Sequence, residues 1–312
     1  MKKRIQRLVL RRLSKPIQWL KMRSFPGFYG YPIYDVGAFF LKGLLRGHLG
    51  IRAAGVAFNV FLSLFPLIIF FFTLIPYIPV ENFQIELLEF IKDVLPDEAY
   101  SLFSVTIEDT IVEQRGQLLS LGIVMMLFFS SNGILALIHA FNATYHSLET
   151  RSGINRRLIS VLLVIILSVL FTTAISLVTA SDFLMDALLS IDFMKSSWVF
   201  FIMNVLKWLI VVALFFFSTS FLYFLAPSKK DRFRFISPGA TLATIIQIVA
   251  ILLFTVYLNN FAQYNKLYGS IGTIMIVMLL LYITAYALLL GFELNASINE
   301  NKILKHNSRQ KK

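Results

Sequence analysis

Six stretches of the chain are almost entirely apolar. Their lengths of 21 to 29 residues match or exceed the ~20 residues that an α-helix needs to cross the hydrocarbon of a bilayer. The stretches cover residues 53–78, 118–145, 158–180, 198–226, 238–258 and 270–296. This pattern predicts an all-α membrane protein with six transmembrane helices, and the transmembrane domain is expected to occupy residues 53–297.

Prolines mark several of the expected helix ends. Pro76 and Pro79 close the first stretch, and Pro227 follows the fourth; a proline removes a backbone donor and stops a helix. Ser237 precedes Pro238, which is the usual order of an N-cap and a first helical residue. The fifth helix is therefore expected to begin at Pro238.

Three further segments lie outside the six stretches. Residues 1–52 mix Lys and Arg with apolar side chains, which predicts a basic cytoplasmic segment lying on the membrane interface. Residues 80–117 form a long external connection in which apolar residues recur at helical spacing, so short amphipathic helices are expected there. Residues 298–312 form a basic cytoplasmic tail.

Composition and charge predict on which side of the membrane each connecting segment lies. The chain is 57% hydrophobic and 15% charged, with a formal net charge of +12, whereas a soluble domain is about 25% charged. The segments on the side of the N-terminus hold 24 of the 29 Lys and Arg residues, and the opposite segments hold four. Because cytoplasmic loops are enriched in Lys and Arg, both termini are predicted to be cytoplasmic. A soluble enzyme is excluded, and the basic excess requires no nucleic acid.

Sequence patterns of catalysis and cofactor binding are absent. The chain has no cysteine and four histidines, none of them in a metal-binding spacing such as H-E-x-x-H, and it has no phosphate-binding loop and no G-x-S-x-G motif. We therefore expect no enzymatic activity, no metal and no other cofactor.

One charged residue falls deep inside a predicted span. Lys207 lies nine residues after Trp198, which places it about 13 Å below the outer boundary. Charged residues at this depth are costly and mark candidate functional sites. Lys207 either binds an anionic substrate or headgroup, or makes a structural contact with polar groups.

A carboxylate lies near the cytoplasmic end of the sixth span. Glu293 should sit roughly 10 Å from Lys207 along the membrane normal, too far for a direct pair. Arg52, His139 or the pair Arg232 and Arg234 are better placed partners, either in an ion pair that locks the bundle or in a functional site.

Four uncharged or weakly basic residues complete this cytoplasmic half. Asn59 and Ser63 share one face of the first span, and His139 and Asn142 share one face of the second. They form either a polar cavity open to the cytoplasm together with Glu293, or hydrogen bonds between helices without any cavity.

Two spans contain residues that weaken a helix. Pro66 falls in the middle of the first span and should kink it. The run Ser130-Ser131-Asn132-Gly133 falls at mid-membrane in the second. Pro66 and Gly133 are candidate helix breaks and Asn132 is a candidate binding residue, since transporters use broken helices at binding sites; small residues also serve plain helix packing.

Several of these motifs resemble the YihY/BrkB family of bacterial inner-membrane proteins. The run from Arg52 to Pro66 (RAAGVAFNVFLSLFP) is similar to its first-span signature, and Ser131-Asn132-Gly133 with FNATY at 141–145 to its second. The remaining matches are Tyr223, Pro227, Arg232-Phe-Arg234, Pro238-Gly239, YGSIG at 268–272 and GFELNA at 291–296. These motifs occur in the family's order over residues 50–300.

The resemblance implies a multi-pass protein of the bacterial plasma membrane. It favours a transporter or exporter of a small solute or lipid, with membrane lipids and that substrate as partners. The alternatives are a scaffold for envelope integrity and virulence, or a tRNA-processing ribonuclease, a label the family has carried. The ribonuclease fits poorly, because the sequence offers no nuclease constellation.

Overall fold

The protein is built from long α-helices, and the described residues contain no strand. The computed structural model describes residues 18–25, 27–28, 30–46, 48–74, 116–144, 150–189, 197–228, 235–260 and 264–310. The helices are α2 (Ile33–Arg46), α3 (Leu49–Leu74), α6 (Gly116–Thr144), α7 (Gly153–Leu189), α8 (Ser197–Leu225), α9 (Pro238–Asn260) and α10 (Tyr264–Gln310).

Six helices are long and apolar enough to cross a membrane, which confirms the prediction from hydropathy. They are α3 and α6 to α10, with candidate spans Leu49–Leu67, Ser120–Thr144, Gly153–Val178, Phe201–Leu225, Pro238–Tyr257 and Ile274–Asn299. α8 ends two residues before Pro227 and α9 begins at Pro238, as expected. The predicted external amphipathic helices, the stop at Pro76 and Pro79, and the first 17 residues lie outside the described residues.

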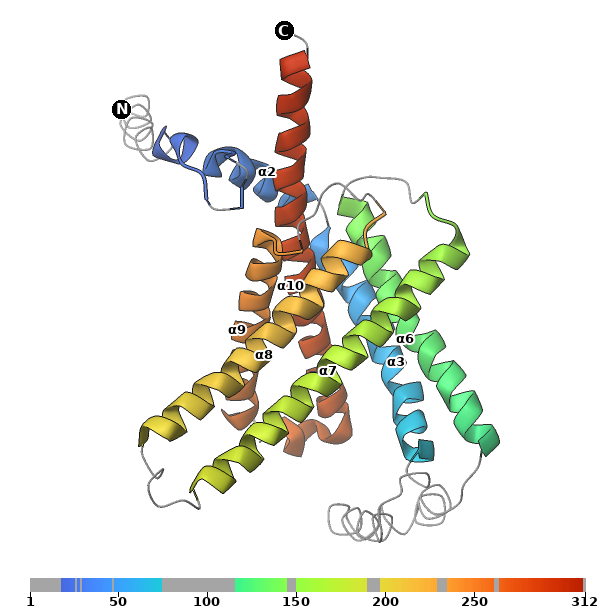
Figure 1. Cartoon of the computed structure of the whole chain (residues 1–312). Helices are drawn as coiled ribbons and strands as arrows, with labels where there is room; N and C mark the ends of the chain where they lie inside the picture. The colour runs from blue at the N-terminus through green and yellow to red at the C-terminus, as the bar shows by residue number, and fades with distance from the viewer. Residues whose placement is uncertain are drawn as a thin grey trace.

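The helices form two antiparallel pairs joined through α10, with a third pair along one side (Figure 1). α3 packs against α6, α9 packs against α10, and α10 also contacts α3. α7 and α8 run side by side and antiparallel, and α7 also touches α6 while α8 touches α9. α2 and the C-terminal end of α10 lie at the same end of the bundle, which we call the terminal end.

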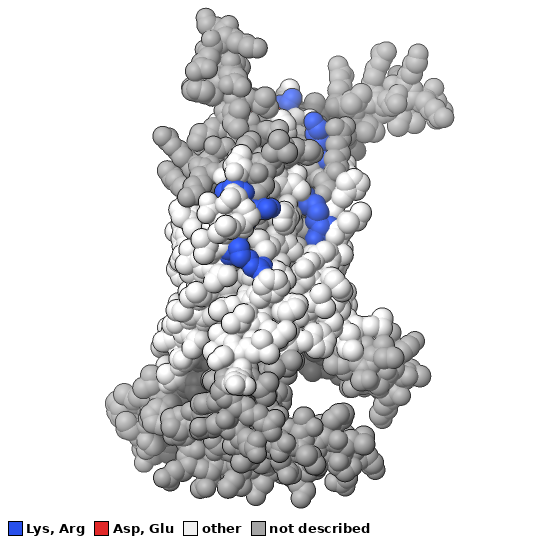
Figure 2. All heavy atoms as spheres, turned by 90° about the vertical axis from the view of Figure 1, so that its right-hand side faces the viewer, with Lys and Arg blue, Asp and Glu red and all other residues white. Residues whose placement is uncertain are grey.

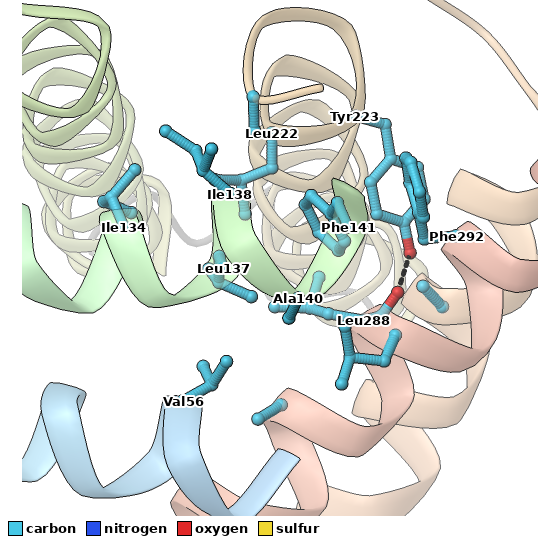
Figure 3. Close-up of a cluster of buried hydrophobic side chains, with 14 of the residues drawn as sticks. Val56, Ile134, Leu137, Ile138, Ala140, Phe141, Leu222, Tyr223, Leu288 and Phe292 are labelled. Atoms are coloured by element: carbon cyan, nitrogen blue, oxygen red, sulfur yellow. Dashed lines mark hydrogen bonds between the residues drawn. The ribbon is translucent and has the colours of Figure 1, made fainter. Parts of the chain in front are cut away.

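An aromatic cluster joins three helices near the terminal end (Figure 3). Phe141 of α6 stacks on Phe292 of α10 with ring centroids 4.3 Å apart, and Tyr223 of α8 meets each of them edge-on at 5.5 Å. The Tyr223 hydroxyl donates a hydrogen bond to the Leu288 carbonyl at 2.5 Å. The buried hydroxyl is thereby satisfied, and one tyrosine ties α8 to α10.

α9 and α10 cross where two glycines face each other. A Cβ atom on Gly239 would lie 2.1 Å from the Gly291 carbonyl oxygen, and one on Gly291 would lie 2.3 Å from the Gly239 carbonyl oxygen. Side chains are therefore excluded from this crossing. Such close backbone approach is typical of membrane helices, whose association depends on packing rather than on hydrophobic driving force.

α2 lies across the terminal end of the bundle, against α10 (Figure 1). Phe28, which precedes it, and Val36 form a small core with Ile298 of α10. Gly43 of α2 lies directly over the Glu293 side chain, so closely that a Cβ there would be 1.9 Å from the carboxylate. α2 is therefore fixed to the last helix of the chain.

The outer surface of the bundle is apolar along most of its length. Large side chains such as Phe201 (59% exposed) and Leu253 (66% exposed) point outward, which suits a hydrocarbon environment. On the face in Figure 2, the described Lys and Arg side chains gather toward the terminal end, and no described Asp or Glu is visible.

Candidate functional site

Two of the five residues predicted to line a polar cavity form hydrogen bonds within their own helix. Asn59 donates to the Gly55 carbonyl at 2.8 Å and Ser63 to the Val60 carbonyl at 2.5 Å, so each binds its own helix. His139 is exposed. Asn59 and Ser63 of the first span therefore form these hydrogen bonds within α3.

Asn142 and Asn132 instead hold neighbouring segments. Asn142 Oδ1 accepts hydrogen bonds from the Ser228 backbone N–H at 3.0 Å and from its hydroxyl at 3.1 Å. Asn132 Oδ1 accepts from the Arg157 guanidinium of α7 at 2.6 Å, and that guanidinium lies 4.0 Å from the Phe128 ring centroid. Asn142 thus makes a contact between segments, as the alternative without a cavity predicted, and Asn132 joins α6 to α7.

Arg52, one of the candidate partners of Glu293, lies where the charge of Glu293 acts on it, whereas the candidates Arg232 and Arg234 lie outside the described residues. Glu293 is buried, with 7% of its surface exposed. The Arg52 guanidinium also donates to the Ala140 carbonyl and the Thr144 hydroxyl at the end of α6. Arg52 therefore ties α3 to the end of α6, and the charge of Glu293 on α10 acts on the same guanidinium.

Neither candidate break interrupts its helix. α3 continues through Pro66 and α6 through Gly133; a proline is tolerated within a membrane helix when neighbouring groups satisfy the backbone. Gly133 instead permits close packing, because a Cβ there would lie 3.0 Å from Val60 Cγ2 of α3. Of the two alternatives for this position, a helix break and close helix packing, the structure shows close packing.

The start of α9 is held by a residue of α10. Ser237 acts as the N-cap, with its hydroxyl accepting from the Ala240 N–H at 3.2 Å, as the sequence predicted. Asn295 Oδ1 accepts from the Gly239 N–H at 2.8 Å, and its amide nitrogen donates to the Ser237 hydroxyl at 2.9 Å. α10 thereby satisfies donors that a helix start would otherwise leave unpaired.

A cavity of about 700 Å³ lies between α7, α8, α9 and α10. Four of its thirteen lining residues are polar: Ser168, Ser218, Thr219 and Gln247. The others are Leu167, Phe171, Ala174, Val178, Val211, Leu214, Phe215, Leu222 and Leu288. The volume falls within the range of about 300–1,000 Å³ that is typical of small-molecule sites. An apolar lining with few polar groups is also typical of such sites.

The polar wall of this cavity joins α8 to α9. The Thr219 hydroxyl donates to Gln247 Oε1 at 3.4 Å, and both side chains are buried. Buried hydroxyls of Ser220 and Thr244 lie on the same two helices, and neither has a hydrogen-bond partner among the described residues. Unpaired polar groups at membrane depth are costly, so this region carries spare hydrogen-bonding capacity.

Lys207 lies beyond the deep end of this cavity. It precedes Val211 by one helical turn, so the two residues share a face of α8, and its side chain is partly buried. Lys207 therefore lies one helical turn from the cavity lining on α8.

Sequence reasoning missed the polar wall. Thr219 and Gln247 of this wall stand inside predicted spans, and the available signal was a polar residue at that position. Their hydrogen-bonding faces became apparent only when α8 and α9 were paired. Among the described residues, no three His, Asp or Glu side chains lie close enough to hold a metal ion.

The fold and the cavity define a multi-pass α-helical membrane protein. The chain belongs to the BrkB virulence factor family: the model of that family, described as virulence factor BrkB, matches residues 40–312. This confirms the resemblance drawn from the motifs.

Two relatives illustrate the range of the family. YfkH of Bacillus subtilis (strain 168), whose name calls it a ribonuclease-like protein, is 35% identical over 254 residues, covering 81% of this chain and 91% of YfkH. A UPF0761 membrane protein of Histophilus somni (strain 2336) is 25% identical over 276 residues, covering 85% of this chain and 90% of the relative. No solved structure matches the chain significantly.

Proposed function

We propose that this protein is a transporter or exporter of an amphipathic small solute or a lipid. The cavity between α7, α8, α9 and α10 carries the proposal, because its polar wall at Thr219 and Gln247 lies at membrane depth. Polar groups in this position are expensive and are typical of substrate pathways. Lys207, one helical turn before the lining residue Val211 on α8, is a separate candidate for contact with the substrate.

The proposal assigns no enzymatic activity to the cavity. Its lining supplies hydroxyl groups and one amide, but no carboxylate, imidazole or amine, whereas hydrolysis commonly uses a nucleophile with a base or a metal. The name of YfkH calls that relative ribonuclease-like; for this chain we propose transport without nucleic acid as a partner.

We place the protein in the bacterial plasma membrane with both termini in the cytoplasm. The support is the excess of Lys and Arg in the segments on the side of the N-terminus, together with the positive-inside rule. Three of these basic residues make hydrogen bonds to other segments. The acceptors are Ala140 for Arg52, Ala226 for Arg151 and Asn132 for Arg157.

Reporter fusions check this orientation. Green fluorescent protein fused after Lys312 should fluoresce, while alkaline phosphatase at the same point should be inactive, because that enzyme requires the periplasmic or external side. The same two reporters fused after Asn260, at the opposite end of α9, should give the reverse pattern. Phosphatase activity at Lys312 would contradict the proposed orientation.

Blocking the cavity should abolish transport without unfolding the bundle. Val211→Trp fills the cavity, whereas Val212→Trp adds the same side chain at the neighbouring position, which is 37% exposed on the outer surface. Each variant is expressed in a strain lacking the native gene, and metabolites and lipids of cells and medium are compared by mass spectrometry. The compound that accumulates in the deletion strain should accumulate equally with Val211→Trp and return to normal with Val212→Trp.

The level of each variant in the membrane fraction provides the control. A Val211→Trp protein present at the wild-type level that restores the normal profile would remove the cavity from the mechanism. Lys207→Ala in the same assay tests the cation separately, and a normal profile there would exclude Lys207 alone.

A further inference from the structure

The cavity lies entirely within segments that face hydrocarbon. Its α7 lining lies in the candidate span Gly153–Val178 and its α8 lining in Phe201–Leu225. Phe171, at its edge, has 59% of its surface exposed on the outside of the bundle. The cavity therefore opens toward the surrounding membrane, and its occupant must be stable in contact with acyl chains.

The dimensions of the cavity match one leaflet of a bilayer. On α8 the lining runs from Val211 to Leu222, which corresponds to about 16 Å of helix at 1.5 Å per residue. Half of a hydrocarbon core of ~30 Å is about 15 Å. A single extended acyl chain of one leaflet has this length.

The polar residues lie in the half of the cavity nearer the terminal end, which Leu167 and Leu222 also line. α7 runs away from the terminal end and α8 runs toward it (Figure 1). Ser168, early in the α7 lining, and Ser218 and Thr219, late in the α8 lining, therefore all lie on the side of the terminal end. The opposite end is lined by apolar residues, among them Val178 and Val211. The cavity is therefore polar where an ester group would lie and apolar where a hydrocarbon tail would lie.

Hydrogen-bonding groups at the polar end suit an uncharged acceptor. Gln247 Oε1 already accepts from Thr219, and the amide nitrogen of a glutamine carries two donors. The serine hydroxyls donate as well as accept. The lining contains no charged side chain, so it offers ester carbonyl oxygens good partners and offers none to an ionic solute.

We propose that this cavity binds one acyl chain of a membrane phospholipid, with the ester group at Ser218, Thr219 and Gln247 and the chain end between Ala174, Val178 and Val211. This assignment rests on the proposed function, because it names the substrate class of the same cavity. The phospholipid enters from the leaflet on the side of the terminal end.

Photo-crosslinking in proteoliposomes tests the acyl-chain site. The purified full-length protein is reconstituted with a phosphatidylglycerol that carries a diazirine near the end of one acyl chain, irradiated, digested and mapped by mass spectrometry. Labelling of α7 around Ala174 and of α8 around Val211 should exceed that of Leu253, an outward residue of α9 that measures contact with bulk lipid. Val211→Trp should reduce the cavity labelling several-fold, and Val212→Trp should leave it unchanged.

A second variant protects the test against misfolding. Ala174→Leu adds less volume from the α7 side of the same cavity, and it should also reduce labelling near Val211, while the elution of both variants in size-exclusion chromatography reports on folding. Cavity labelling equal to that of Leu253 in the wild type, or unchanged by both variants, would overturn the acyl-chain assignment.

The two proposals fail in distinguishable ways. If Val211→Trp abolishes transport in cells but the cavity is labelled no more than Leu253, the transporter stands and its substrate has no acyl chain. If cavity labelling falls with Val211→Trp while the cellular profile stays normal, the acyl-chain site stands and the transport function is wrong.

Discussion

Replacing Gly291 with alanine is expected to destabilise the protein severely. The added Cβ would lie 2.3 Å from the Gly239 carbonyl oxygen and 2.6 Å from the Tyr223 hydroxyl, distances at which the backbones of α9 and α10 must move apart. Overpacking costs typically 1–3 kcal/mol, and we expect at least the upper end, about 3 kcal/mol, because the contact is with backbone. Thermal unfolding of the detergent-purified protein should show a clearly lower midpoint.

Gly55→Ala is the matched control for this experiment. Gly55 also lies inside a membrane helix, but nothing stands within 4 Å of a Cβ built on it. Alanine is intrinsically better than glycine in a helix by about 1 kcal/mol, so the control should be neutral or slightly stabilising. Equal unfolding midpoints for the two alanine variants would show that the α9–α10 crossing tolerates a side chain.

Replacing Arg52 with methionine should destabilise the protein about as much as Gly291→Ala, for an electrostatic reason. The change leaves the Glu293 carboxylate buried without the cation that acts on it, and it removes the donor to Ala140 and Thr144. Removing one partner of a buried charge pair costs about 3–5 kcal/mol. The measurement is again the thermal midpoint, together with the amount of folded protein recovered from the membrane.

A double variant separates charge from packing. Arg52→Met combined with Glu293→Gln removes both charges, so it should be more stable than Arg52→Met alone; contacting residues in such cycles couple by about 0.5–3 kcal/mol. Lys42→Met, at an exposed position of α2, controls for loss of a cation at the terminal end and should change little. No gain from the second substitution would exclude the charge pair as the source of the loss.

The spans and several helix ends follow directly from the sequence. Long apolar runs can satisfy their backbone in lipid only as helices, so six such runs fix six helices whatever their neighbours. Ser237 and Pro238 likewise act within one turn, and the structure places the start of α9 where they predict it. These features depend on local chemistry alone.

The orientation of each helix about its own axis could not be predicted. In a membrane both the lipid-facing and the core-facing sides are apolar, so hydropathy does not reveal the buried side. For Asn59 the sequence left open a shared cavity or a hydrogen bond between helices, and the residue instead binds its own helix. Thr219 and Gln247, which form a wall together, are 28 residues apart in sequence and acquire a common face only through the packing of α8 against α9.

The position of α2 has a consequence for the order of assembly. Its contacts, Glu293 and Ile298, belong to the last helix of the chain, although α2 itself is synthesised before any of the six spans. During synthesis from the N-terminus, the docking surface for α2 does not exist until α10 has been made. α2 can therefore dock over Glu293 only after α10 has been synthesised.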